Sequence, residues 1–556
     1  MNLDEALPEN VQHWHYIVRA FTFVMDSESL QFDVIIIGAG INGAGIARDA
    51  ASRGLRVLLL DKGDIGGGTS SWSTRLIHGG LRYLEHGEFR LVRESLRERE
   101  TLLRIAPHLV RPLPLLVPVY ENAHRGIWTI RAGMMAYDAL SFRKSLPGHR
   151  WLSCAETVHK VPGLEPVGLL GAASYFDAQV EFAERLVLEN VLAAVAYGAR
   201  VVTYARVDKL LVDDGSVCGV RFSRRQGDAT VATARIVINA AGPWVDHLLD
   251  TASLNSERLI GGTKGSHLVV APFSGAPRTA IYVEAETDGR PFFIIPWNNK
   301  YLIGTTDIPF DGNPDEARIT DGEIDYLLHE ANRVLPTASL TRKQILFAYS
   351  GVRPLPYTAD RAARKITRRH FIKPHRQVVN LFSIVGGKLT TYRSLAEQAV
   401  DAIFKRLGQD PPDCKTDRES LPGAAPDFRA FSDQFQQRSP FSPATTDRLL
   451  RIYGTRAELI MKLVKQDQSL GEVFDPETGA FAAEIVFAFT DEFAATLADC
   501  LLRRAMVGLN STCGLDAIDA AGRIARRCLG WSEDRVTEET AAYRQEVLTR
   551  LAVGLP

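Results

Sequence analysis

The sequence predicts an α/β (α+β) fold in three parts: a domain built on a parallel sheet, a β-rich domain interleaved with it, and an all-helical C-terminal domain. Three observations lead to this division. Continuous β-branched runs flank a glycine-rich turn near residue 38, prolines and short strands interrupt the middle of the chain, and helical periodicity dominates beyond residue 427. Such apolar runs suit strands that are buried on both faces of a parallel sheet.

The composition is that of a globular protein with several cores. The chain has 556 residues, of which 46% are hydrophobic and 24% are charged, which is enough for two or three domains. Lys and Arg (65) nearly balance Asp and Glu (66), so we expect no nucleic-acid partner. The six cysteines show no zinc-ligand spacing, so we expect no metal site.

The sequence has no segment that is typical of a membrane span or a secretion signal. No apolar run approaches the roughly 18 residues that cross a bilayer, and no basic segment followed by an apolar one opens the chain. Residues 1–31 are predicted to be an extension outside the fold. Because Met25 stands just ahead of the first predicted strand, a start codon assigned too early is an alternative explanation for this segment. We expect a cytoplasmic protein, either soluble or attached to a membrane surface.

The first elements form a βαβ unit. A strand from Phe32 to Ile37 (FDVIII) leads into a glycine turn, a helical stretch from Ile46 to Ser52 follows, and a second strand from Val57 to Leu60 ends at Asp61. We expect Asp61 to accept the hydroxyl groups of a ribose, because an acid at this place does so in dinucleotide sites.

The glycine turn, Gly38-Ala39-Gly40-Ile41-Asn42-Gly43, has the GxGxxG pattern. Gly38 permits the tight turn, Gly40 lets a pyrophosphate approach the backbone, and Gly43 lets the helix pack closely on the strand. The helix N-terminus then favours the negative charge of the phosphates. The unit predicts a Rossmann-like dinucleotide site, but it does not by itself separate NAD from FAD.

The remaining elements predict the domain organisation. We expect a domain over residues 32–407, a β-rich substrate domain interleaved at about 106–175 and 260–345, a linker at 408–426 that is rich in Pro, Gly and charge, and a helical domain at 427–556. The supporting elements are an amphipathic helix at 89–104, buried strands at 234–240 and 381–385, shorter strands at 292–295 and 301–303, and helical stretches at 446–453 and 481–507.

The segment from Gly66 to Glu85 (GGGTSSWSTRLIHGGLRYLE) resembles a known family. Its Gly, Ser and Thr suit the wrapping of a bulky cofactor, and LIHGGLRYLE is similar to the signature of FAD-dependent glycerol-3-phosphate dehydrogenases of the aerobic type, within the D-amino-acid-oxidase-like flavoproteins. The resemblance covers about residues 32–400 and is looser in the helical part. It continues through VINAAGPWVD (237–246), KGSHLV (264–269), GTTD (304–307), GVRPL (351–355), GGKLTTYR (386–393) and ADCLLRRA (498–505).

The resemblance implies an FAD-binding domain with FAD as the cofactor. The implied cofactor-binding residues are Gly38, Gly40, Gly43, Asp61, Ser70, Thr74, His78, Gly79, Val207, Ala240, Gly242, Gly387 and Thr390. The turn Gly386-Gly387-Lys388 also has an interpretation of its own, because it follows a strand and is predicted to open a helix. A helix N-terminus at the N1/O2 edge of the flavin would stabilise the negative charge of the reduced ring.

The resemblance also implies a substrate, glycerol 3-phosphate, and residues that bind it. Its phosphate requires cations, which implies Arg82, Tyr83 and Lys388, while Arg353 and His267 are expected to line the reacting C2 carbon. In the implied reaction a base removes the proton of the C2 hydroxyl group and hydride passes from C2 to flavin N5, giving dihydroxyacetone phosphate.

The electron acceptor and three other functions remain open at this stage. We favour a quinone over oxygen, since the insertion common among glycerophosphate oxidases is not evident. Another FAD-dependent amine or 2-hydroxyacid oxidoreductase would lack the combined motifs of Arg82 and Lys388. A nicotinamide-dependent dehydrogenase would not need the Gly- and Ser-rich segment after Asp61, and a non-enzymatic flavin-binding sensor would show no turnover.

A quinone acceptor leads us to expect a peripheral contact with the cytoplasmic face of the inner membrane. A basic run is the candidate contact, because clustered cations attract anionic lipid, although such a run is more often a solvated face. Its members are Arg361, Arg364, Lys365, Arg368, Arg369, Lys373 and Arg376. We also expect a homodimer.

Overall fold

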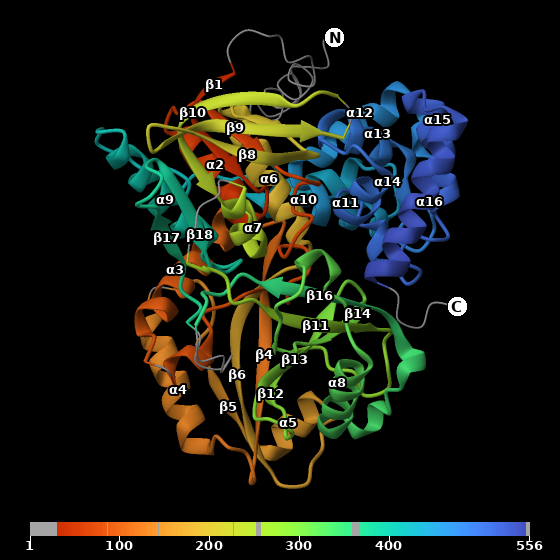
Figure 1. Ribbon diagram of the computed structural model, residues 1–556. Helices are drawn as coiled ribbons and strands as arrows, with labels where there is room; N and C mark the ends of the chain where they lie inside the picture. The colour runs from red at the N-terminus through yellow and green to blue at the C-terminus, as the bar shows by residue number, and fades with distance from the viewer. Residues whose placement is uncertain are drawn as a thin grey trace.

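The computed structural model describes residues 30–85, 87–142, 144–225, 227–251, 257–358 and 367–551. In this part of the chain, two large sheets lie one above the other, and the C-terminal helices pack beside the upper one (Figure 1). The predicted fold class is confirmed. Residues 1–29, which make up most of the predicted extension, lie outside the described residues.

The first sheet is parallel at its centre and contains the strands predicted at 32–37, 57–60, 234–240 and 381–385. Val34 lies opposite Val57 on one side and Ile236 on the other, and all three are almost completely buried. The order of the main path is β17 (Phe371–Pro374), β18 (Leu381–Val385), β10 (Thr230–Asn239), β1 (Gln31–Ile37), β2 (Val57–Leu60) and β7 (Arg200–Val202), while β8 (Ala205–Asp213) pairs with β9 (Ser216–Arg224), which pairs with β10.

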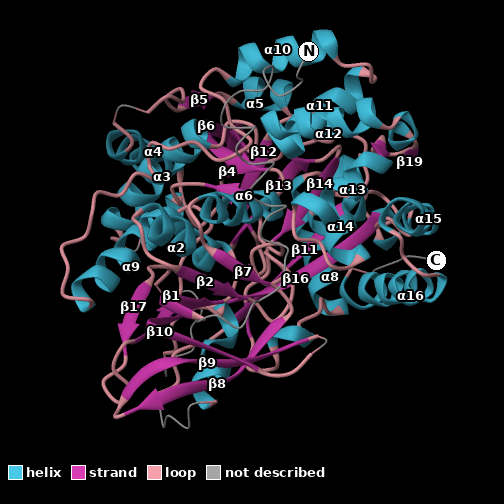
Figure 2. Ribbon diagram, turned by 90° about the horizontal axis from the view of Figure 1, so that it is seen from above, coloured by secondary structure: helices cyan, strands magenta, loops and turns pink. Residues whose placement is uncertain are grey.

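Three helices pack together beside this sheet: α2 (Ile41–Ser52), α6 (Ala183–Ala196) and α9 (Tyr392–Arg406). Figure 2 shows α2 and α9 next to β1, β10 and β17. Two predicted helix starts were wrong. The first helix begins at Ile41 rather than Ile46, directly after the glycine turn. The segment Gly386-Gly387-Lys388 is a turn rather than a helix start, because both glycines have positive φ angles (78° and 99°) and α9 begins only at Tyr392.

The second sheet has ten strands and forms the lower half of Figure 1. The strands predicted at 292–295 and 301–303 lie inside it, and the helix predicted at 89–104 is α3 (Phe89–Ile105). The order of its main path is β15 (Ile308–Pro309), β11 (Thr263–Val270), β14 (Lys300–Gly304), β13 (Pro291–Trp297), β12 (Ala280–Glu284), β4 (Val110–Tyr120), β6 (Leu169–Val180) and β3 (Leu76–Ile77), with β16 (Ile345–Arg353) on β11 and β5 (Arg150–Leu152) on β6.

Helices surround the second sheet. They are α4 (Ile127–Leu140), α5 (Cys154–Lys160) and α8 (Asp321–Val334). A short 3-10 helix, η2 (Leu81–Leu84), precedes α3. No described helix is both long enough and apolar enough to cross a bilayer.

The C-terminal part is helical apart from a two-stranded ribbon of β19 (Val473–Asp475) and β20 (Ala480–Phe481). The helical stretch predicted at 481–507 divides into two helices, because Phe493 has a positive φ angle (59°) and Thr496 caps a new helix. The helices are α10 (Phe428–Arg438), α11 (Pro443–Tyr453), α12 (Ala457–Gln466), α13 (Ala482–Asp491), α14 (Leu497–Arg503), α15 (Ile518–Leu529) and α16 (Glu533–Arg550).

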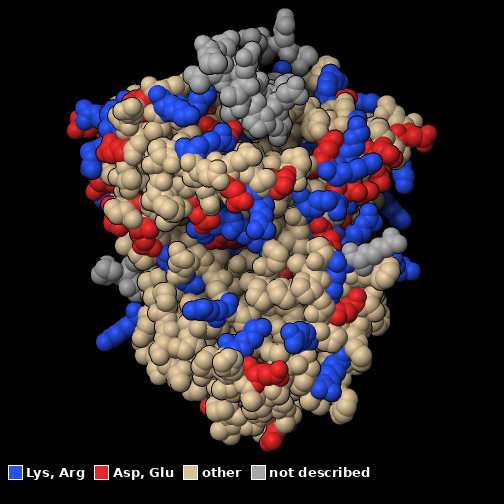
Figure 3. Space-filling view, turned by 180° about the vertical axis from the view of Figure 1, so that it is seen from behind, with Lys and Arg blue, Asp and Glu red and all other residues tan. Residues whose placement is uncertain are grey.

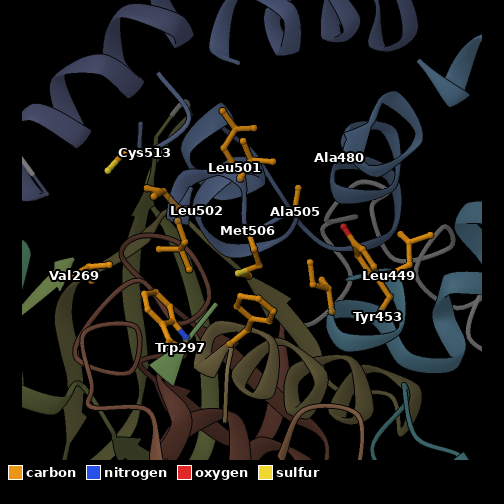
Figure 4. Packing of buried hydrophobic residues seen from close by; sticks show 14 of the residues in the cluster. Val269, Trp297, Leu449, Tyr453, Ala480, Leu501, Leu502, Ala505, Met506 and Cys513 are labelled. Carbon is orange, nitrogen blue, oxygen red and sulfur yellow. The ribbon is translucent and has the colours of Figure 1, made fainter. Parts of the chain in front are cut away.

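One apolar core joins the second sheet to the C-terminal helices. Trp297 of β13 points toward Leu502 and Met506 of the C-terminal part, with Tyr453 nearby (Figure 4). Because all four side chains are buried, the C-terminal helices are packed against the rest of the molecule rather than tethered to it. The domain boundaries themselves stay a prediction.

Candidate functional site

A cavity of about 740 Å³ opens beyond the carboxyl ends of β1, β2 and β10. This edge is where open α/β sheets bind their ligands, and the volume lies in the range of cofactor pockets. Eight of the predicted cofactor residues line the cavity. They are Gly38, Gly40, Asp61, Ser70, Val207, Ala240, Gly242 and Gly387.

The glycine turn leaves the start of α2 open toward the cavity. Gly40 is the N-cap and has no side chain to cap the helix, and the Ile41 N–H donates to Ser70 Oγ at 3.0 Å. Gly38 has a φ angle of 108°, and a side-chain carbon on Gly43 would overlap the Gly38 carbonyl oxygen. The three glycines therefore have the geometry that a pyrophosphate site requires.

Two polar side chains of the cavity wall test whether a dinucleotide fits. Asp61 accepts the N–H groups of Ala39 (2.6 Å) and Gly63 (2.8 Å), and burial raises the pKa of its carboxyl group. Asn42 donates to the Gly386 carbonyl at 3.3 Å, but its Oδ1 is buried without a hydrogen-bond partner. An unpaired buried acceptor is costly, so a ligand that carries donors, such as FAD, fits this wall.

Four predicted cofactor residues do not line the main cavity but fix the loop beside it. The His78 N–H donates to Thr390 Oγ1 at 3.1 Å, and the Gly79 N–H donates to the Tyr137 hydroxyl at 2.9 Å. The fourth, Thr74, shares a hydrogen bond with His267. Burial, together with nearby cations, lowers the pKa of His78 to about 4, so this imidazole is neutral at pH 7.

Cations converge on Tyr83, in η2, as the substrate assignment requires. Lys388 Nζ lies 3.7 Å from the centre of the Tyr83 ring. Burial alone would raise the pKa of Tyr83, but the charges of Lys388, Arg368 and Arg82 outweigh it and lower the pKa. Burial lowers the pKa of Lys388. The structure thus brings Arg82, Tyr83 and Lys388 together.

Asp307 holds two more guanidinium groups next to this cluster. Arg353 of β16 lies 3.1 Å from one of its carboxylate oxygens, and Arg368 lies 2.9 Å from the other. Burial alone would raise the pKa of Asp307, but the two arginines outweigh it and lower the pKa. Four cations, Arg82, Arg353, Arg368 and Lys388, therefore surround one carboxylate and Tyr83. The net charge of the group is positive and suits a phosphate dianion.

Arg368 was wrongly included in the basic run that was the candidate contact with lipid. Its side chain is 11% exposed and is paired with Asp307, so it faces the cluster rather than the surface. Lys373, in contrast, is 49% exposed. Arg361, Arg364 and Lys365 lie outside the described residues.

His267 lies on β11, next to the strand that carries Arg353. Its Nε2 is 2.9 Å from Thr74 Oγ1, and its Nδ1 is buried without a hydrogen-bond partner. Burial, reinforced by the charges of Arg353 and Arg75, holds its pKa well below the ordinary value. The ring is therefore neutral at pH 7, so one of its two nitrogens is a hydrogen-bond acceptor.

The C-terminal helices also reach the cavity. Arg503, Glu546 and Arg550 are among its lining residues. None of the three was predicted to bind the cofactor, although Arg503 stands in the motif ADCLLRRA, because this part of the chain was predicted as a separate domain. No cluster of three or more potential metal ligands occurs in the part of the chain that the structure describes.

The chain is similar to known oxidoreductases over nearly its whole length. Residues 33–402 match the family described as FAD dependent oxidoreductase, and residues 414–536 match the C-terminal domain of alpha-glycerophosphate oxidase. A glycerol-3-phosphate dehydrogenase of Synechocystis is 46% identical, with 93% of this chain and 96% of the relative covered. A D-erythritol 1-phosphate dehydrogenase of Brucella abortus is 37% identical, with 85% and 93% covered.

A solved structure is similar as well. The glycerol-3-phosphate dehydrogenase of Bacillus halodurans complexed with FAD gives a TM-score of 0.78 at 28% identity, with 96% of this chain and 97% of that chain covered. The similarity therefore extends over both sheets and the C-terminal helices.

Proposed function

Because the chain belongs to the FAD-dependent oxidoreductase family, we propose that it oxidises sn-glycerol 3-phosphate to dihydroxyacetone phosphate. One observation carries the choice of substrate: Arg82, Arg353, Arg368 and Lys388 gather around Tyr83, and Lys388 also lines the cofactor cavity. A phosphate bound there lies beside the cofactor. The names of the relatives at 46% and 28% identity support the same substrate.

In the proposed reaction, Arg82 and Lys388 bind the phosphate group and Tyr83 positions the ammonium group of Lys388. Bound FAD supplies the acceptor for the hydride that leaves C2. His267 accepts the proton of the C2 hydroxyl group, because its imidazole is neutral and Nδ1 lacks a partner within the protein. Arg353 stabilises the negative charge that develops on the C2 oxygen.

A longer polyol phosphate is the second candidate substrate. The relative at 37% identity is named for D-erythritol 1-phosphate, which also presents a phosphate and a secondary alcohol to the enzyme. The cation cluster would bind either phosphate, so the two candidates differ in the room left for the extra carbon.

The absorption spectrum of the holoenzyme tests both candidates. We expect anaerobic addition of glycerol 3-phosphate to bleach the oxidised flavin band, and D-erythritol 1-phosphate to do so more slowly at equal concentration. If only D-erythritol 1-phosphate bleaches the band, it replaces glycerol 3-phosphate as the proposed substrate. An unchanged spectrum with both compounds would refute the proposed activity.

We further propose that a quinone reoxidises the enzyme at a membrane surface, with α4 as the contact. Trp128 and Met135 of this helix are 76% and 61% exposed, and Ala132 and Ala139 complete the same outward face. An apolar face of this kind suits binding to a lipid surface. In the rear view of Figure 3, charged side chains are sparser over the lower part of the molecule than over the upper part.

A second cavity of about 390 Å³ adjoins α4 and supports a quinone as the acceptor. Its lining combines apolar side chains, such as Ile130 of α4 with Leu81 and Leu84 of η2, and charged side chains. The segment η2 also carries Arg82 and Tyr83. An apolar acceptor that enters from the lipid would therefore approach Arg82 and Tyr83 from the side that α4 covers. A homodimer stays a prediction, which sedimentation of the purified protein will test.

A further inference from the structure

The wall of the cofactor cavity is completed by the C-terminal helices. Arg503 comes from α14, while Glu546 and Arg550 come from α16, and the lining also includes Tyr204 of the turn between β7 and β8. Cofactor binding was predicted for the first domain alone. The cavity lining instead includes cationic groups that are remote from it in sequence.

A buried carboxylate ties this wall to the turn after β2. The Asp64 carboxylate accepts a hydrogen bond from Arg503 Nε at 2.5 Å. It also accepts hydrogen bonds from the two terminal nitrogens of Arg504, at 2.9 and 2.7 Å. Burial alone would raise the pKa of Asp64, but Arg504 and Arg503 outweigh it and lower the pKa. The carboxylate is therefore ionised, and separating α14 from this turn exposes an unpaired charge.

A second link runs through Asp499. Its carboxylate accepts Arg503 at 2.8 Å and the Tyr204 hydroxyl at 2.6 Å. The Tyr204 N–H in turn donates to the Gly63 carbonyl, and the Gly63 N–H donates to Asp61. A continuous polar chain thus connects the predicted ribose acceptor with α14.

Arg550 is a lining cation whose charge is only weakly neutralised by the residues that the structure describes. Its ion pair with Glu546 measures 4.0 Å, and its side chain is 33% exposed. Two other lining cations are paired more closely: Lys62 lies 2.6 Å from Asp315, and Arg206 lies 3.0 Å from Asp208. An anionic ligand in the cavity would complete the pairing of Arg550.

We propose that the C-terminal domain is part of the cofactor site, in which Arg550 binds the anionic diphosphate of FAD and the Asp64 cluster with Arg503 and Arg504 holds the wall closed. FAD then leaves only when α14 and α16 move away from the turn after β2. The proposal uses the cofactor of the family and does not depend on which polyol phosphate is oxidised.

Release of FAD from the full-length holoenzyme tests the contact directly. We expect Arg550→Gln to raise the dissociation rate of FAD about tenfold, measured by the recovery of flavin fluorescence on dilution, and Arg550→Lys to restore part of the difference. Tenfold is the lower end for a charged hydrogen bond, because the side chain is a third exposed. Raising the salt concentration should reduce the difference in FAD dissociation rate between the parent and Arg550→Gln.

Arg544→Gln is the matched control. It removes an arginine of the same helix that is 49% exposed and pairs with Asp519 at 2.8 Å, so FAD release should keep its parental rate. If Arg550→Gln releases FAD at the parental rate, the proposed contact of Arg550 with the diphosphate is refuted. An equal loss of thermal midpoint in the apo and holo forms of that variant would also overturn it, because the residue would then act on folding alone.

The Arg504→Met variant tests whether the Asp64 cluster holds the C-terminal helices against the cofactor cavity. Arg504 holds Asp64 but does not line the cavity, and the apolar contact of Leu502 and Met506 with Trp297 keeps α14 packed. We expect faster FAD release together with faster proteolysis of the C-terminal helices in the apo form. FAD release at the parental rate would overturn the closing role of the cluster.

Discussion

Replacing Lys388 by Met should separate recognition of the phosphate from the chemistry at C2. The ammonium group lies 3.7 Å from the Tyr83 ring centre and 3.4 Å from Ser95 Oγ, in a buried position. A hydrogen bond to a charged group is worth about 1.5 to 3 kcal/mol, so we expect kcat/KM for glycerol 3-phosphate to fall about 10- to 150-fold. Unphosphorylated glycerol should lose much less.

Anaerobic stopped-flow reduction of the bound flavin compares the parent and Lys388→Met with glycerol 3-phosphate and with glycerol as substrates. Since Lys388 also lines the cofactor cavity, the flavin content of each preparation is measured first. Lys373→Met is the control, because Lys373 is 49% exposed and lies 3.9 Å from Glu257, and it should match the parent. If glycerol and glycerol 3-phosphate suffer the same penalty in Lys388→Met, the phosphate assignment is refuted.

Further predictions concern the base, the pH dependence, the membrane face and the extension. His267→Asn should slow flavin reduction about 100- to 10,000-fold, the range for loss of a general base, and leave the affinity for a phosphate-bearing product analogue nearly unchanged; reduction at the parental rate would assign the base elsewhere. Because the pKa of His267 lies well below 6.5 in the folded protein, the imidazole stays neutral as the pH falls, and the limiting reduction rate should be flat from pH 8 to pH 6; a decline centred near 6.5 would contradict this. Trp128→Ser should reduce sedimentation with lipid vesicles at high salt, whereas Arg369→Ser should not, and equal binding by both variants would exclude α4 as the contact. Deletion of residues 1–24 should leave flavin content and turnover with a soluble acceptor unchanged, since β1 begins at Gln31; loss of flavin would make the extension part of the fold.

The strands of the first sheet could be predicted because their apolar runs are continuous. The start of α2 was missed because Gly43 and Gly45 lower the local helix propensity. Packing overrides that propensity: a side-chain carbon on Gly45 would come within 2.7 Å of the Tyr392 ring of α9. Gly45, which weakens the helix signal, is thus also the residue that lets the two helices approach, while Gly43 lets α2 pack against the turn at Gly38.

The candidate site was predicted from motifs, and its omissions have a common cause. Arg82, Tyr83 and Lys388 stand in segments with a family signature. Arg503 stands in the looser motif ADCLLRRA, but its place at the cavity, like the place of Arg368 in the cation cluster, depends on a tertiary partner. Arg368 depends on Asp307, and Arg503 depends on Asp64. Spacing along the chain carries no information about such pairs, so a basic run and a separate domain were the natural interpretations.

The spread of the cavity lining along the chain has a consequence for biosynthesis. The lining begins at Ile37 and reaches Arg550, so the first βαβ unit leaves the ribosome long before the wall opposite it exists. A newly made chain therefore exposes its glycine turn, uncovered, through most of translation. A cavity wall that includes Arg550 can therefore enclose a flavin only after almost the whole chain has been made.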